Sequence, residues 1–325
     1  MRRPSVGWIP LLGLLNVLSA CSASSWQAPL GRDHVLVGRI WDVAAGKFID
    51  RRDLDTRLAR ADFVLLGEKH DNPDHHRLQA DILRTLIGAG RRPAVAFEMY
   101  TADDADAIAS HLARAPKDAA GLGPAVNWDT SGWPDWAMYQ PIAEAALGAR
   151  QPIIAANLSN STARKMSRDG QALDASLTRE LGLDRPLADP LRARMAADIR
   201  HSHCGYGSEA SVNAMVEVQR ARDAQMARSL IKGATADGAV LIAGSGHGRN
   251  DYGVPIYLAA AAGNKRVVSI AFTEVDERAV DPGLYALPED AGRAPFDYLW
   301  FTPRVDNEDP CEKFKAQIER LKKPQ

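Results

Sequence analysis

A run of four apolar residues, 63–66, is the clearest buried segment in the chain. So short a run, with a glycine directly after it, is typical of a strand covered on both faces. Asn72 and Pro73 follow, an N-cap residue and a proline at the first helical position. Apolar residues then recur at helical spacing as far as Gly88. The segment therefore predicts a strand, a turn and a long helix.

Polar residues follow this strand directly. We expect Gly67 to let the backbone turn sharply, which leaves Glu68 and His70 at the strand's carboxyl end. In open α/β sheets ligands bind at that edge. The pattern returns in residues 238–247, where an apolar run ends in Gly-Ser-Gly-His and the histidine is His247. Two Gly-x-x-His segments, each closing a buried strand, predict that His70 and His247 approach one cleft.

Three further apolar runs predict strands. They end at Glu98, at Asn157 and at Phe272, and segments with a helical period lie between them. Alternating strands and helices predict an α/β fold with a mostly parallel central sheet flanked by many helices.

The domain organisation follows from the same pattern. No Gly-, Ser- or Pro-rich linker interrupts residues 50–275, so we expect one domain there. Residues 21–49 are expected to form a tether and a short hairpin. Residues 276–325 are expected to form a C-terminal extension that is mostly loop and tail.

The first twenty residues have the features of an export signal. Arg2 and Arg3 precede an apolar stretch, and Leu-Ser-Ala stands before Cys21. A cysteine in that position resembles a bacterial lipobox, which implies cleavage before Cys21 and lipidation (palmitate) of its thiol. Ser22 resembles the sorting residue of outer-membrane lipoproteins. The alternative is a plain signal peptide with an incidental cysteine. The apolar stretch is too short for a good membrane span.

Composition narrows the function only slightly. The chain has 325 residues, 46% hydrophobic and 25% charged, with a formal net charge of −1. This is ordinary for a globular protein, and it gives no case for a nucleic-acid partner.

A long helix is predicted from Ser208 onward, and its apolar line contains two polar residues, Gln219 and Asp223. The line runs through Val212, Val216, Gln219, Asp223, Met226 and Leu230 at spacings of three and four. A buried amide or carboxylate without a partner costs several kcal/mol. Either the two residues pair with local backbone or with Arg222, or they stand behind a functional site together with Asn157.

Two cysteines remain after Cys21. Cys204 and Cys311 form a disulfide if the protein is exported to an oxidising compartment. The alternative is that Cys204, beside His203, is a ligand.

Several of these segments together resemble the ChaN-like family of haem-binding, iron-regulated lipoproteins in the Tiki/erythromycin-esterase-like superfamily. The segments are Leu-Leu-Gly-Glu-Lys-His-Asp-Asn (65–72), Phe-Glu-Met (97–99), Ala-Ala-Asn-Leu (155–158), His-Cys-Gly (203–205), Gln-x-x-Arg-Asp-Ala-x-Met-Ala (219–227) and Gly-Ser-Gly-His with Gly-Val-Pro (244–255). The resemblance implies a Tiki/EreA–ChaN-like α/β fold and an outer-membrane lipoprotein. It also implies haem bound between two protomers of a homodimer, in haem or iron uptake or storage.

The resemblance further implies a tyrosine ligand to haem iron, without indicating which one. Phenolate is a recognised axial ligand. Tyr139 lies among tryptophans that could stack on a porphyrin, and Tyr206 lies in the loop of residues 201–207. We expect Tyr139, unless it and the tryptophans are core; Tyr100 and Tyr252 are further candidates. His203, His70 and His247 are the other candidate haem contacts. No Cys-x-x-Cys-His is present, so we expect non-covalent, b-type haem.

A rival hypothesis uses the polar strand ends as a metal or catalytic site. Glu68, His70, Glu98 and His247 include the ligand types that hold divalent metals, and His70 could act as a general base in a metal-dependent hydrolase. The structural alternative is that Glu98 and His247 form a hydrogen-bonded pair that braces the sheet edge.

Overall fold

A computed structural model describes residues 26–169, 173–286, 293–309, 311–312 and 315. The predicted lipid-modified Cys21 lies outside these residues. The strands are β1 (Ile40–Asp42), β2 (Lys47–Ile49), β3 (Phe63–Glu68), β4 (Ala94–Thr101), β5 (Ile153–Asn157), β6 (Ala239–Gly244), β7 (Val267–Glu274) and β8 (Tyr298–Thr302). The helices are α1 (Arg51–Leu58), α2 (Pro73–Gly88), α3 (Ala105–Arg114), α4 (Leu122–Ala125), α5 (Trp136–Gly148), α6 (Asn160–Asp169), α7 (Ala175–Glu180), α8 (Asp189–Ser202), α9 (Glu209–Gly233), α10 (Val254–Ala262) and α11 (Gly283–Ala286).

All eight strands form one sheet, in the order β2-β1-β8-β7-β3-β6-β4-β5. The six strands from β8 to β5 in this order pair in parallel, and only β1 and β2 are antiparallel to their neighbours. The mostly parallel α/β fold expected from the sequence is therefore confirmed.

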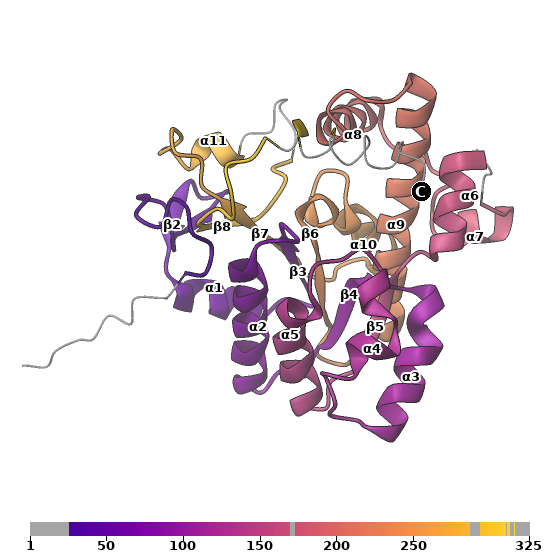
Figure 1. The fold of residues 1–325 in the computed structure, drawn as a ribbon, viewed down its shortest axis with the longest axis horizontal. Coiled ribbons are helices and arrows are strands. Elements are labelled where there is room, and N and C mark those ends of the chain that lie inside the picture. The colour runs from indigo at the N-terminus through magenta and orange to yellow at the C-terminus, as the bar shows by residue number, and fades with distance from the viewer. Residues whose placement is uncertain (1–25, 170–172, 287–292, 310, 313–314, 316–325) are drawn as a thin grey trace, which may run out of the picture.

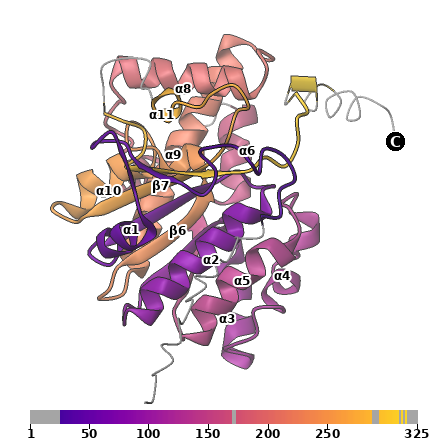
Figure 2. The same ribbon diagram turned by 90° about the vertical axis from the view of Figure 1, so that its left-hand side faces the viewer.

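Helices cover the sheet on both faces, which explains why β3 is apolar at every early position. Val64 and Leu66 point to the core formed with α1, α2 and α5. Phe63 and Leu65 point to the opposite core, formed with α9 and α10. Successive side chains of a strand point to opposite faces, so a strand buried on both sides needs an unbroken apolar run. Figure 2 shows α2 and α5 on one side and α9 and α10 on the other.

The predicted helix after the first buried strand is present as α2, and it begins at the predicted cap. The Asn72 side chain accepts a hydrogen bond from the backbone N–H of Asp74, and α2 runs from Pro73 to Gly88. The predicted hairpin before residue 50 is present as β1 and β2.

The expectation that residues 276–325 are mostly loop and tail is wrong over Tyr298–Thr302. These residues form β8, which is buried and lies inside the sheet between β1 and β7. β8 has an apolar, aromatic run of its own, Tyr-Leu-Trp-Phe, which is a strand signal. No helix in the described part of the chain is long and apolar enough to cross a membrane.

Candidate functional site

The predicted site residues meet at the carboxyl edge of three neighbouring strands. Glu68 closes β3, Glu98 lies in β4, and His247 lies in the short 3-10 turn, Ser245–Gly248, that follows β6. Because β3, β6 and β4 are parallel neighbours, their carboxyl ends bring these side chains together. We call Glu68, His70, Glu98, Asp223 and His247 the acid–imidazole cluster.

Two glycines permit the close packing at this edge. A Cβ at Gly67 would lie 2.9 Å from the Cα of Ser245, and a Cβ at Gly244 would lie 2.8 Å from Nε2 of His70. Gly67 is therefore not the sharp turn that the sequence suggested. It remains in β3 and lets the turn after β6 approach the strand.

One half of the cluster surrounds the buried Glu68 carboxylate. Oε1 lies 2.8 Å from His70 Nδ1 and accepts a 2.8 Å hydrogen bond from the Tyr139 hydroxyl. Oε2 accepts from Gln79 Nε2 at 2.6 Å and lies 3.2 Å from His76 Nδ1. Burial alone would raise the pKa of Glu68, but the His76 and His70 imidazoles outweigh it and hold this pKa well below its usual range.

The other half surrounds His247. Its Nε2 lies 3.2 Å from Glu98 Oε1, while its Nδ1 lies 2.5 Å from Asp223 Oδ1 and 3.0 Å from Gln219 Nε2. Burial alone would lower the pKa of His247, but the Glu98 and Asp223 carboxylates raise it to about 10. Although burial opposes ionisation of Glu98, the imidazole holds the pKa of that carboxyl at about 2. His247 is therefore an imidazolium ion between two buried acids, and the hydrogen-bonded Glu98–His247 pair is present.

The two polar residues on the apolar line of α9 contact His247 of the acid–imidazole cluster and, among the described residues, do not pair with local backbone. Asp223 is fully buried and contacts His247, and Gln219 reaches the same ring. Burial raises the pKa of Asp223 to about 6. Asn157 donates to the backbone carbonyl of Glu98 at 3.0 Å. Arg222 does not form an ion pair with Asp223, and instead lines a cavity described below.

His70 is the accessible member of the cluster. Its side chain is 35% exposed, and burial is outweighed by Glu68 and Glu98, which raise its pKa. Its ring packs against Trp133, with centroids 4.8 Å apart. His70 and His247 thus approach the same place, as the repeated Gly-x-x-His pattern predicted.

This arrangement does not favour the metal-dependent hydrolase. The four residues of that hypothesis, Glu68, His70, Glu98 and His247, are paired with one another or with neighbouring side chains. Within the described ranges, no group of three or more His, Cys, Asp or Glu side chains is placed to hold a metal ion.

The structure also argues against Tyr139 as the iron ligand. Tyr139 is fully buried, its hydroxyl donates to Glu68, and its ring packs on Trp128 and Trp136 in the main core. Burial and the Glu68 carboxylate raise its pKa far above the ordinary value, which opposes phenolate formation. The alternative that these aromatics are core is correct. Tyr100 and Tyr252 are buried too.

Tyr206 has the opposite environment. It is 47% exposed, and it is the only large aromatic side chain left exposed among the described residues. Its loop contains three residues with positive φ: Cys204, Gly205 and Gly207.

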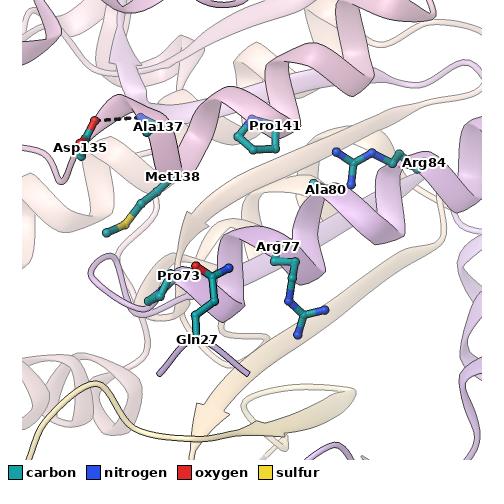
Figure 3. Close-up of a pocket in the computed structure, with 9 residues that line it drawn as sticks. All are labelled: Gln27, Pro73, Arg77, Ala80, Arg84, Asp135, Ala137, Met138 and Pro141. Carbon is teal, nitrogen blue, oxygen red and sulfur yellow. Dashed lines mark hydrogen bonds between the residues drawn. The ribbon is translucent and has the colours of Figure 1, made fainter. Parts of the chain in front are cut away.

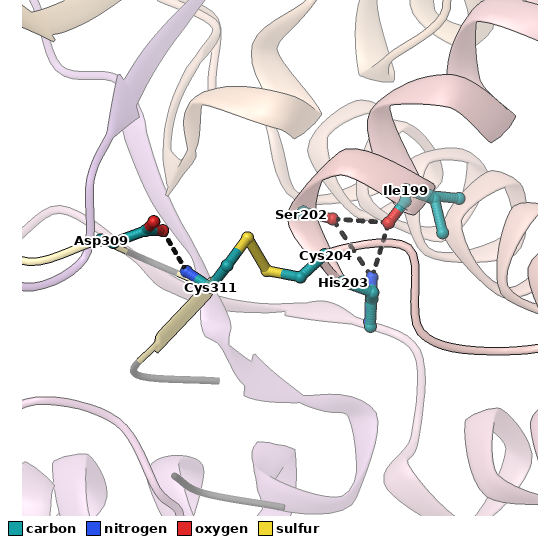
Figure 4. The surroundings of a disulfide bond; sticks show 6 residues. All are labelled: Ile199, Ser202, His203, Cys204, Asp309 and Cys311. Atoms are coloured by element: carbon teal, nitrogen blue, oxygen red, sulfur yellow. Dashed lines mark hydrogen bonds between the residues drawn. A yellow bond between two sulfur atoms is a disulfide. The ribbon is translucent and has the colours of Figure 1, made fainter. Parts of the chain in front are cut away.

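The predicted disulfide is present, with Cys204 bonded to Cys311 and the Cα atoms 5.3 Å apart, so Cys204 is not a ligand. Figure 4 shows the bond beside His203, whose Nδ1 donates to the Ile199 carbonyl at 2.8 Å.

Two cavities are relevant to the site. One lies between helices α2 and α5, and the other lies at the carboxyl ends of strands β4 and β5. The first, about 600 Å³, lies between α2 and α5 beside Gln27 (Figure 3). Its two arginines are already paired, Arg77 with Asp74 and Arg84 with Asp81. The second, about 530 Å³, adjoins the acid–imidazole cluster and is lined by Trp133, Asn157 and Arg222 among others.

The sequence-based prediction missed two members of the site, His76 and Gln79. Both lie on the buried face of α2 and reach Glu68. With Leu83 and Leu86 they follow helical spacing, so the same test that found Gln219 and Asp223 would have found them.

This chain is similar to one protein family and to two solved structures. The family described as "Haem-binding uptake, Tiki superfamily, ChaN" matches residues 54–258, more than half of the chain. A solved structure described as "Cofacial heme binding to ChaN of Campylobacter jejuni" superposes with a TM-score of 0.63 at 24% identity, over 80% of this chain and 95% of that one. The type III effector HopBA1 gives a TM-score of 0.42 at 14% identity, over 77% and 92%. No curated protein matches. The chain is therefore a member of the ChaN family of haem-binding uptake proteins in the Tiki superfamily.

Proposed function

We propose that this protein is an envelope lipoprotein that binds haem non-covalently for haem or iron uptake or storage. Membership of the ChaN family supports haem binding. We place the haem site at Tyr206 because this side chain is exposed and lies in a loop that the Cys204–Cys311 disulfide holds.

The donor set of this loop fits haem iron. Ferric iron accepts a tyrosine phenolate as axial ligand, and Tyr206 is exposed enough to supply one. His203 lies in the same loop, with its Nδ1 fixed as a donor to a backbone carbonyl. Tyr206 would hold the iron, and His203 would contact the bound group. Non-covalent, b-type binding agrees with the absence of a Cys-x-x-Cys-His motif in the chain.

The loop is anchored on both sides. α8 ends at Ser202, α9 begins at Glu209, and the disulfide ties Cys204 to Cys311. Such anchoring reduces the number of conformations available before a ligand arrives, which favours binding. An exposed ligand residue also allows a second protomer to approach. This supports a homodimer around haem, as does the cofacial haem binding described for ChaN of Campylobacter jejuni.

Two features support the envelope location. The sequence around Cys21 resembles a lipobox, and the Cys204–Cys311 disulfide suits an oxidising compartment outside the cytoplasm. Lipid on Cys21 would anchor the protein to the bacterial outer membrane. Labelling cells with a palmitate analogue tests this, because a Cys21→Ser variant should carry no label and should leave the membrane fraction.

Hemin titration of the chain from Ser22 onward tests haem binding and its ligand together. We expect a saturable Soret shift near one haem per chain in the wild-type protein. Tyr206→Phe should lose the tyrosinate-type spectrum, whereas Tyr139→Phe should retain it. A wild-type protein with no saturable shift would overturn the proposal, and an unchanged spectrum in Tyr206→Phe would overturn the ligand assignment.

A further inference from the structure

We propose that the cavity beside the acid–imidazole cluster is a carboxylate-binding site in which Arg222 is the anchoring residue. The carboxylate could belong to a haem propionate, in which case the inference rests on the proposed function, or to a free organic acid. Both sources share the same chemistry, an anionic carboxylate joined to an apolar body.

The cavity opens at the carboxyl ends of β4 and β5. It measures about 530 Å³, and its walls come from these strands, the turn after α4, and α9. Its lining includes Met99, Trp128, Trp133, Asn157 and Arg222.

Arg222 is the cation in this wall, and within the described residues no hydrogen bond or salt bridge holds its guanidinium. The side chain is half-buried. The Asp223 carboxylate is near enough for an electrostatic interaction with Arg222, but it contacts His247 instead. A guanidinium stays charged at any physiological pH and has five N–H donors in a planar fork. Partial burial of such a group without an anion is unfavourable, and a carboxylate bound by both prongs satisfies it best. The side chain therefore has the geometry of a binding group that lacks its partner.

The other polar groups of the wall are mostly engaged. Asn157 donates to Glu98 and accepts from Leu158, and the hydroxyls of Thr130 and Ser131 donate to backbone carbonyls.

The acid in the wall, Asp104, does not neutralise Arg222. Its Oδ2 accepts from both the backbone N–H and the hydroxyl of Thr101. At the mouth, the side chains of Asn127 and Asn160 make no hydrogen bond in the part of the chain that the structure describes. The groups left to bind a ligand are thus one guanidinium and two amides.

The remaining wall is apolar. Met99, Trp128 and Trp133 line it, and Trp133 also packs edge-on against His70. Met99 and Trp128 are almost fully buried, so Trp133 is the aromatic surface that an apolar body would contact, and the guanidinium suits the acid at its end. A ligand held by Arg222 would therefore extend beside the accessible imidazole of the cluster.

The cavity between α2 and α5 provides an internal comparison. Its arginines, Arg77 and Arg84, are both neutralised by aspartates on their own helix. An arginine in a cavity wall of this protein is therefore ordinarily paired, and Arg222 departs from that pattern.

The test compares Arg222→Gln with Arg228→Gln in the purified protein. Arg228 lies on the same helix but pairs with Glu180 and does not line this cavity. Each variant is titrated with hemin, with hemin dimethyl ester, whose propionates are neutral, and with benzoate, using benzamide as the uncharged control.

Loss of the charge-assisted contact should weaken binding of a carboxylate about 10- to 100-fold in Arg222→Gln and leave Arg228→Gln unchanged. Weaker hemin binding with unchanged ester binding identifies the propionate as the occupant. Unchanged hemin binding with loss of benzoate but not benzamide identifies a free acid. If wild-type protein binds benzoate through Arg222 and binds no hemin, the haem proposal fails and this site stands. Equal affinities in Arg222→Gln and wild type for all probes, or equal losses in both variants, would overturn the inference.

Discussion

In the acid–imidazole cluster, Glu68, Glu98 and His247 are buried and paired with neighbouring side chains, whereas the loop between α8 and α9 holds Tyr206 at the surface. Both regions contain residue types that bind metals or catalyse reactions. In the first, the acids and imidazoles are paired with one another, so their charges hold three strand ends in place. In the second, the chain is anchored by its flanking helices and a disulfide while one phenol stays accessible. The ligand site that we propose therefore lies in the region where a side chain of such a type is accessible.

This contrast predicts different roles for the two regions: stability for the acid–imidazole cluster and haem binding for the loop that carries Tyr206. Substitutions in the cluster should act mainly on stability, because they leave a buried charge without its partner. Substitutions of exposed loop residues should act mainly on haem binding, because they remove little buried surface. Four measurements test this division.

The largest effect should come from His247→Gln. Removing the imidazolium leaves Glu98 and Asp223 as buried acids without a cation, and breaking a buried ion pair in this way costs about 3–5 kcal/mol. Urea unfolding at neutral pH measures the loss. The matched control is His201→Gln at an exposed position, which should change the free energy of unfolding by less than about 0.5 kcal/mol. Equal midpoints for the two variants would contradict a structural role of the cluster.

The disulfide should rank second. Replacing Cys204 and Cys311 together by serine should cost about 2–4 kcal/mol, because the unfolded chain is no longer cross-linked over 107 residues. Hemin affinity should fall as well, since the loop that carries Tyr206 loses its tether. Reducing agent should reproduce both effects in the wild-type protein and should have no further effect on the double variant. Full hemin affinity in the double variant would show that the tether is dispensable.

The pH dependence should have a definite sign. The pKa of His247 is raised from 6.5 to about 10, so its contribution is complete below pH 6.5 and is lost as the pH rises through about 10. The difference in unfolding free energy between wild type and His247→Gln should therefore shrink over that range. The pKa of Glu98 is lowered from 4.5 to about 2, so its contribution is lost on acidification through about pH 2. A difference that grows with pH above 6.5 would refute the assignment of His247 as imidazolium.

The smallest effect on stability should be that of Tyr206→Phe, below about 0.5 kcal/mol, although the haem spectrum changes. Tyr139→Phe should behave in the reverse manner. It leaves the buried Glu68 carboxylate short of a donor, which costs about 1–3 kcal/mol, while the haem spectrum stays as in wild type. Thermal unfolding and Soret absorbance of the two variants, measured side by side, distinguish the two tyrosines.

Local sequence signals predicted the parts of the fold that depend on neighbours in the chain. The cap at Asn72 and the apolar run of β3 are of this kind. The meeting of Glu68, Glu98 and His247 was predictable as well, because carboxyl ends of parallel strands share one edge of the sheet.

Features set by packing between distant segments were not predictable. Tyr139 lies on an aromatic helix, and the sequence does not say whether that face meets the sheet or a ligand. Gly67 is needed because Ser245, far along the chain, approaches it, so no local turn signal applies. β8 itself has a local strand signal that should have been used, but its place between β1 and β7 depends on contacts with distant segments.

The place of β1 between β2 and β8 has a consequence for the order in which the molecule is completed. β1 is synthesised well before β8, the strand that covers its other edge: the side-chain hydrogen bond from Arg57 to Tyr298, beside this pair of strands, spans 241 residues. A two-stranded hairpin is at best marginally stable by itself. One edge of β1 therefore stays unpaired until residues 298–302 are available to form β8. Truncation before residue 298 would leave that edge exposed in the finished protein, where unpaired strands promote aggregation.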